Sequence, residues 1–213
     1  MNASISISFL MEAVYNGDTT ALQKIIKSGT NVNVLDENGE PLIFIPIVNG
    51  DMDTLKVLLP YADTSMTNDD GRTLLMVAVE MNDMDMVKKI VKSGADVNKK
   101  DNSGKTAILI ALEGGNFKIA EYLIKHGSDV NVVDDLGQSA LHLVATGEHN
   151  DCTKIVKILF NCGYQMKDID NWLSPEDVMS NPKFKSKYLK LIHKVKTSLK
   201  AISNCDHIIP VVP

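Results

Sequence analysis

The chain has 213 residues, of which 44% are hydrophobic and 23% are charged, and its formal net charge is -5. This composition is that of a folded chain with a buried core, so it excludes extensive disorder. The acidic balance argues against a protein that binds nucleic acid by neutralising phosphates.

The cysteine content and the hydrophobic pattern indicate the compartment. Cys152, Cys162 and Cys205 are few and odd in number, which is not the pattern of a disulfide scaffold. The first residues form neither a basic leader nor an apolar run of signal-peptide length, and nowhere are there about 18 consecutive apolar residues to span a bilayer. We therefore expect a cytoplasmic protein without a membrane span, with the nucleus as the alternative location.

Four glycines recur at a nearly constant interval and mark an internal repeat. Gly39, Gly71, Gly104 and Gly137 stand 32, 33 and 33 residues apart. An acid or amide precedes each glycine by three residues, at Asp36, Asn68, Asp101 and Asp134. Such a period is typical of a solenoid that repeats one supersecondary unit.

Each unit carries two short apolar patterns that predict two helices. The first pattern follows a hydroxyl residue, so Thr73, Thr106 and Ser139 are predicted to cap the N-terminus of the first helix. The second pattern has apolar residues at i, i+1, i+4 and i+5, as over residues 86–91, which is one face of a helix. Glycine then ends the second helix, as at Gly94.

These features resemble the ankyrin repeat, which joins a hairpin turn, a helix opened by Thr-Pro-Leu-His, a second helix and a Gly-Ala-Asp-Val-Asn ending like that of residues 94–98. The resemblance implies an all-α fold, an ankyrin-repeat solenoid of helix–turn–helix units with β-hairpin loops. We predict central repeats at 36–67, 68–100, 101–133 and 134–167, an N-terminal capping repeat at 1–35, a C-terminal capping repeat with a basic helix at 168–200, and an extended tail at 201–213.

The unit at 36–67 departs from this pattern. Pro46 stands where the next two units have Ala78 and Ala111, and one residue is missing near Pro60. Proline in a helix interior removes a hydrogen bond and costs about 3 kcal/mol. We therefore predict a shortened or kinked first helix in this unit.

The architecture predicts a binding function, because residues at the loop tips and helix ends of a stacked array are free of packing roles. We expect a non-enzymatic protein–protein interaction module, acting as scaffold, adaptor or inhibitor, that is monomeric on its own and holds no cofactor. The candidate partner-binding residues are Glu37, Asn38, Glu40, Asp69, Asp70, Arg72, Glu80, Met81, Asn102, Ser103, Lys105, Glu113, Asp135, Leu136 and Gln138, with Tyr15, Asn16 and Thr146 at further helix ends. Acids and amides dominate, which favours a protein partner of basic or mixed polar character.

Two other functions stay open on the sequence. The chain could serve as a substrate-receptor adaptor of a ubiquitin ligase, although residues 201–213 match neither an F-box nor a SOCS-box, or as a structural spacer or oligomerising repeat protein. The basic segment 182–196 is interpreted as a polar cover of the last repeat; the alternative is an amphipathic helix for an acidic partner or an anionic membrane.

Catalytic and metal chemistry find little support. No Gly-rich phosphate loop, nucleophile elbow or pair of catalytic carboxylates is present. His142 stands at the histidine position of the Thr-Pro-Leu-His motif, so its expected role is structural. His149, Cys152 and Cys162 have the chemistry of zinc ligands, but their spacing does not recur and no second paired motif exists, so no metal site is predicted.

The resemblance also suggests one modification. Asn98 and Asn131 end an Asp-Val-Asn sequence and follow Ile90 and Leu123 by eight residues, as do the ankyrin asparagines that an oxygen-dependent hydroxylase modifies. Both are candidate hydroxylation sites in a host that has this enzyme.

Overall fold

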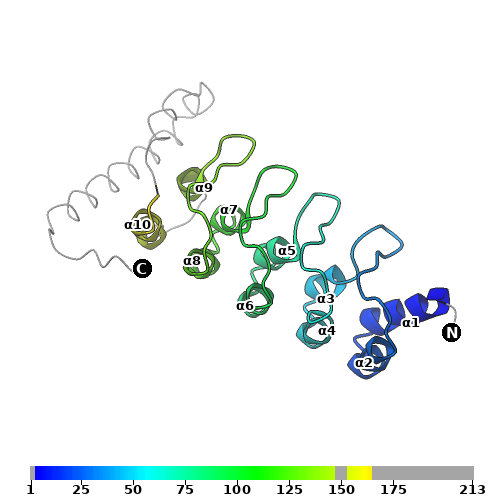
Figure 1. The fold of residues 1–213 in the computed structure, drawn as a ribbon. Coiled ribbons are helices and arrows are strands. Elements are labelled where there is room, and N and C mark those ends of the chain that lie inside the picture. Colours follow the sequence, from blue (N-terminus) through cyan, green and yellow to red (C-terminus); the bar gives the residue numbers. More distant parts are fainter. Residues whose placement is uncertain (1–2, 147–152, 165–213) are drawn as a thin grey trace, which may run out of the picture.

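The computed structural model describes residues 3–146 and 153–164, and it places them in one row of stacked helix pairs (Figure 1). The pairs are α1 (Ala3–Tyr15) with α2 (Thr19–Lys27), α3 (Phe44–Val48) with α4 (Met52–Leu58), α5 (Leu74–Glu80) with α6 (Met84–Lys92), α7 (Ala107–Glu113) with α8 (Phe117–Lys125), and α9 (Ala140–Thr146) with α10 (Thr153–Asn161). Within the described ranges only isolated β-bridges occur, such as Thr67 with Thr73 at the base of a loop. The predicted all-α ankyrin-repeat solenoid is confirmed.

The odd-numbered helices lie on the side of the long loops, and the even-numbered helices lie on the opposite side (Figure 1). We call the surface formed by the loop tips and the C-terminal ends of the odd-numbered helices the inner face; it carries the loop tips and helix ends that the sequence predicts to be free of packing roles. One helix pair falls within each predicted unit from 1–35 to 134–167, while the exact boundaries of the units stay a prediction.

The core is continuous from one helix pair to the next. Met86, Val87 and Ile90 of α6 are at most 1% exposed, as the apolar pattern over 86–91 predicts. Neighbouring first helices contact each other from α1 through α3, α5 and α7 to α9. Each unit therefore buries its apolar surface against its neighbours, which is how a solenoid gains its stability.

The three residues predicted as helix caps form different hydrogen bonds. Thr73 caps α5, because its hydroxyl accepts from the backbone N–H of Met76 at 3.3 Å. The prediction for Thr106 is wrong: its side chain makes no cap bond to α7, and its buried hydroxyl has no hydrogen-bond partner among the described residues. At Thr73 the Met76 sulfur accepts from the threonine N–H in return, whereas the equivalent Leu109 offers no acceptor. Ser139 Oγ lies 2.6 Å from the hydroxyl of Tyr164.

The prediction of a shortened helix in the second unit is confirmed. Helix α3 has five residues, whereas α5 and α7 have seven. It begins at Phe44, so Pro46 falls in the first turn, where a backbone N–H has no partner within the helix. The proline is accommodated by this later start.

Several predictions fall on residues outside the described ranges. These are the C-terminal capping repeat at 168–200, the basic segment 182–196 and the tail 201–213, together with His149 and Cys152. Among the helices of residues 3–146 and 153–164, none is long and apolar enough to cross a membrane.

Candidate functional site

Each long loop is held by one acidic or amide side chain at its base. Asp101 Oδ1 accepts from the backbone N–H groups of Ser103 at 2.9 Å and Lys105 at 2.8 Å. The corresponding side chains in the other loops are Asp36, Asn68 and Asp134. Burial disfavours the charged form of Asp36, but the hydrogen bonds from the backbone of its loop outweigh that effect and hold its carboxyl pKa below the usual value. The loop acids are therefore structural elements that fix the tips.

Backbone hydrogen bonds join the last three tips to one another. The N–H of Asn102 donates to the carbonyl oxygen of Asp70 at 3.0 Å, and its side-chain amide donates to that of Asp69 at 2.9 Å. The N–H of Asp135 donates to the carbonyl oxygen of Ser103 at 3.0 Å. We call these three connected tips, residues 68–72, 101–105 and 134–138, the hairpin ledge. Because the backbone makes the connections, the ledge does not depend on the carboxylates of Asp69 and Asp70.

The first tip, residues 36–40, stands apart from the ledge. Among the described residues no hydrogen bond joins it to the tip at 68–72. A methyl group added at Gly71 would lie 2.9 Å from the backbone nitrogen of Asn102, whereas one added at Gly39 would meet nothing within 4 Å. The four tips therefore comprise one connected group of three and one separate loop.

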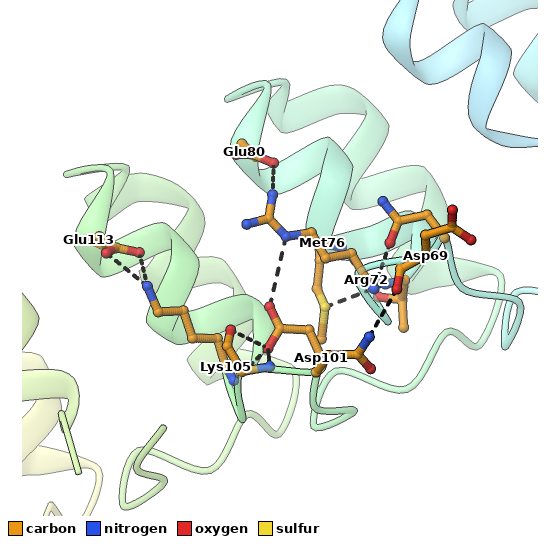
Figure 2. Close-up of polar contacts among 11 residues, drawn as sticks. Asp69, Arg72, Met76, Glu80, Asp101, Lys105 and Glu113 are labelled. Atoms are coloured by element: carbon orange, nitrogen blue, oxygen red, sulfur yellow. Dashed lines mark hydrogen bonds and ion pairs between the residues drawn. The ribbon is translucent and has the colours of Figure 1, made fainter. Parts of the chain in front are cut away.

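Ion pairs cross the inner face in two neighbouring units (Figure 2). Arg72 binds Glu80 at 2.5 Å, and Lys105 binds Glu113 at 2.7 Å. Arg72 Nε also lies 3.8 Å from Asp101 Oδ2, whose side chain is only 2% exposed. Four candidate residues are thus brought together as two pairs that neutralise each other. Sequence analysis had assigned Asp101 to the loop but had not identified its contact with Arg72.

The other candidate residues divide by exposure. Most present exposed side chains at the tips or helix ends, namely Glu37, Asn38, Asp69, Asp70, Met81, Asn102, Asp135 and Leu136. Leu136 is 81% exposed, which is the largest value among the large hydrophobic residues described. Glu40 and Gln138 are half-buried. Ser103 is exposed, but its hydroxyl turns back to donate to Asp101 at 2.8 Å.

Sequence analysis missed Val48, which ends α3 on the inner face and is 58% exposed. Its position corresponds to Glu80 and Glu113 in the next two units. That correspondence was visible in the sequence, but an apolar residue within an apolar run is ordinarily expected to be buried.

The two candidate hydroxylation sites bridge neighbouring units. The Asn98 side chain donates to the carbonyl oxygen of Gly127 at 3.0 Å and accepts from the N–H of Asp129 at 2.8 Å. The Asn131 side chain donates to the carbonyl oxygen of Gly163 at 3.2 Å. These bonds give both asparagines a structural role, and their hydroxylation stays a prediction.

His142 is half-buried on α9, where the surroundings favour the neutral form of its ring. Burial lowers its pKa to about 4, and its Nδ1 accepts from the N–H of Ser139 at 3.4 Å. This arrangement supports a structural role, as expected from the motif. The described residues contain no group of three or more His, Cys, Asp or Glu side chains placed to hold a metal ion, and Cys162 is an exposed free thiol.

Comparison with known proteins identifies the class of this repeat array. The family described as "Ankyrin repeats (3 copies)" matches residues 10–101 and again residues 82–170. The chain belongs to the ankyrin-repeat family. Ankyrin repeats are generally protein–protein interaction modules, and the family is typically non-enzymatic.

Two curated proteins share part of this sequence. The nuclear factor NF-kappa-B p105 subunit of Gallus gallus is 30% identical over 86 residues, which cover 38% of this chain and 9% of that protein. The Notch-regulated ankyrin repeat-containing protein of Xenopus laevis is 36% identical over 85 residues, covering 38% of this chain and 75% of that protein. The matched region thus spans about a tenth of the first relative and three quarters of the second.

Proposed function

We propose that this chain is a non-enzymatic adaptor, scaffold or inhibitor that binds a protein partner through the hairpin ledge and the inner face. The observation that carries the proposal is the backbone connection of three consecutive tips through Asn102 and Asp135. A surface that is already ordered loses little conformational entropy when a partner binds, so more of the contact energy is retained as affinity. Exposed side chains on such a surface can vary without disturbing the fold.

The charges on the ledge favour a partner of basic or mixed polar character. Asp69, Asp70 and Asp135 are exposed and form no ion pair with a described residue, whereas Arg72 and Lys105 are neutralised by their own glutamates. The net field of the ledge is therefore acidic. Complementary charge on a partner would accelerate encounter and fix its orientation.

Charge reversal on the ledge tests this function. The variant Asp69→Lys, Asp70→Lys keeps the backbone atoms that accept from Asn102, so it leaves the ledge in place. The matched control is Asp53→Lys, Asp85→Lys, which reverses two carboxylates that are 80% and 82% exposed on α4 and α6, on the opposite side of the array. Circular dichroism and urea unfolding establish that both variants remain folded.

The measurement is affinity capture from host cytosol with quantitative mass spectrometry, followed by direct binding of the captured proteins. We expect proteins that bind the wild type and the control but are reduced at least tenfold on the ledge variant. Equal capture by all three forms would contradict binding through the ledge.

We also propose that the chain acts in the cytoplasm, with the nucleus as a second location. The low cysteine content and the free thiol of Cys162 are compatible with a reducing compartment. Fractionation of host cells with an antibody against the native chain tests this, and recovery in secreted material would contradict it.

A further inference from the structure

The inner face repeats one pair of positions in successive units. The residue after the loop glycine and the last residue of the first helix are eight positions apart, and in two units they form the ion pairs Arg72–Glu80 and Lys105–Glu113. In both pairs the cation is on the loop and the carboxylate is on the helix. The geometry of the array thus brings these two positions into direct contact.

The unit before them carries different chemistry at the same two positions. Glu40 occupies the position of Arg72, and Val48 occupies the position of Glu80. Glu40 is half-buried, and within the described ranges its carboxylate forms neither an ion pair nor a hydrogen bond. A carboxylate therefore stands in the place of the cation, and an exposed apolar side chain stands in the place of the helix carboxylate. No cation of the described chain neutralises Glu40.

Tyr15 holds the helix-end position of the preceding unit, as Val48 does in this one. It ends α1, which contacts α3, and its side chain is 53% exposed. Its hydroxyl donates to Asp36 Oδ2 at 3.3 Å, so the ring is tethered to the base of the first loop. Partial desolvation and then the negative charge of Asp36, with a smaller effect of Glu37, raise the pKa of the Tyr15 hydroxyl, which is consistent with a locally acidic surface.

We propose that Tyr15, Glu40 and Val48 form a subsite that receives an arginine side chain of the protein partner. This proposal rests on the proposed function, because it names the chemistry that one part of the inner face recognises. The guanidinium would supply the cation that Glu40 lacks, and the methylene groups would cover Val48. Arginine suits the site better than lysine, because its planar guanidinium can pair with a carboxylate and lie against an aromatic ring at the same time.

The neighbouring units also provide a variant that should fold. The double change Glu40→Arg, Val48→Glu reproduces the residues found at Arg72 and Glu80, so it should close the subsite with an internal ion pair. Glu40→Gln removes the charge alone. Glu80→Gln is the matched control, since it removes an inner-face carboxylate that already has a partner.

The experiment selects peptides from a random phage-displayed library on the full-length chain and then measures Kd by fluorescence polarisation. Each selected peptide is made with arginine and with citrulline, which has the same shape without the charge. We expect arginine-containing peptides that lose about tenfold in affinity on changing to citrulline, a fold-change typical of one charged contact at a partly buried site. This preference should persist in Glu80→Gln and disappear in Glu40→Gln and in the double variant.

The arginine subsite would be overturned if the selected peptides were acidic or purely apolar. It would also be overturned if the loss of affinity with citrulline persisted in Glu40→Gln. If such peptides still lose affinity for Asp69→Lys, Asp70→Lys, the hairpin ledge remains a binding surface and only the arginine assignment fails. If neither the ledge variant nor any inner-face variant changes their affinity, the proposed function fails as well.

Discussion

The connection between loop tips makes Gly104 a position where one methyl group should be costly. Gly104 has φ of +74°, so alanine there would adopt a left-handed conformation at a cost of about 1 kcal/mol. Its Cβ would also lie 2.9 Å from the backbone nitrogen of Asp135. To relieve this contact the two tips must separate, which weakens the 3.0 Å hydrogen bond from Asp135 to Ser103 and costs about another 1 kcal/mol.

Gly39→Ala provides the control, because Gly39 has φ of +85° and open space around its Cβ position. We expect Gly104→Ala to lower the free energy of unfolding by about 2 kcal/mol and Gly39→Ala to lower it by about 1 kcal/mol. Urea unfolding followed by far-ultraviolet circular dichroism measures both values.

Amide hydrogen exchange locates the effect. In Gly104→Ala the amide of Asp135 should lose protection, because its bond to the neighbouring tip is weakened. In Gly39→Ala the same amide should exchange as in the wild type. Equal destabilisation by the two substitutions, with unchanged protection of Asp135, would refute the connected ledge.

Two further predictions concern buried polar groups. Thr106→Val should stabilise the chain by about 1 kcal/mol in urea unfolding, because it removes a buried hydroxyl without a partner among the described residues. Thr73→Val should destabilise the chain by about 1 kcal/mol, because it removes the cap on α5. The opposite order of stabilities would show that the two hydroxyls were assigned wrongly. Burial lowers the pKa of His142 from 6.5 to about 4, so the fold favours the neutral ring. This shift corresponds to about 3 kcal/mol, which the partial exposure of the ring reduces to about 2 kcal/mol of stability that is present above pH 6.5 and lost as the pH falls toward 4. His142→Gln should remove the decline in the free energy of unfolding between pH 6.5 and 4.5. Glu121, with a pKa of about 2, affects stability only at lower pH, so it does not interfere with this measurement. An unchanged decline in the variant would show that another group causes it.

The sequence predicted the repeat architecture well, because each loop and helix is specified by residues that lie close together in the chain. The glycine period located the loops, and the position of Pro46 predicted a short helix, which α3 is. The cap at Thr106 was predicted wrongly, because a hydroxyl before an apolar run permits a cap bond but does not oblige the side chain to form it. At Thr73 the side chain three residues later also accepts from the cap N–H, whereas the side chain of Leu109 has no acceptor atom.

The chemistry of the inner face was harder to predict, since it depends on which residues the fold brings together. Arg72 and Glu80 were both predicted as separate contact residues. They form an ion pair because the fold brings the C-terminal end of α5 close to the loop that precedes this helix. Val48 was missed for a different reason, because its sequence context predicts a buried side chain. Its apolar neighbours Phe44 and Ile47 are buried in the array, but Val48 itself, at the end of α3, is exposed.

The separation of the tip at 36–40 from the hairpin ledge has a consequence for how this sequence can change over time. An insertion or a bulkier residue at Gly71 must displace the backbone of the following tip, and the disturbance passes along the connected loops. At Gly39 the same change enters open solvent and disturbs one loop only. The first loop is therefore the part of this surface that can diversify in length and composition without loss of the array, and it carries Glu40 at its end.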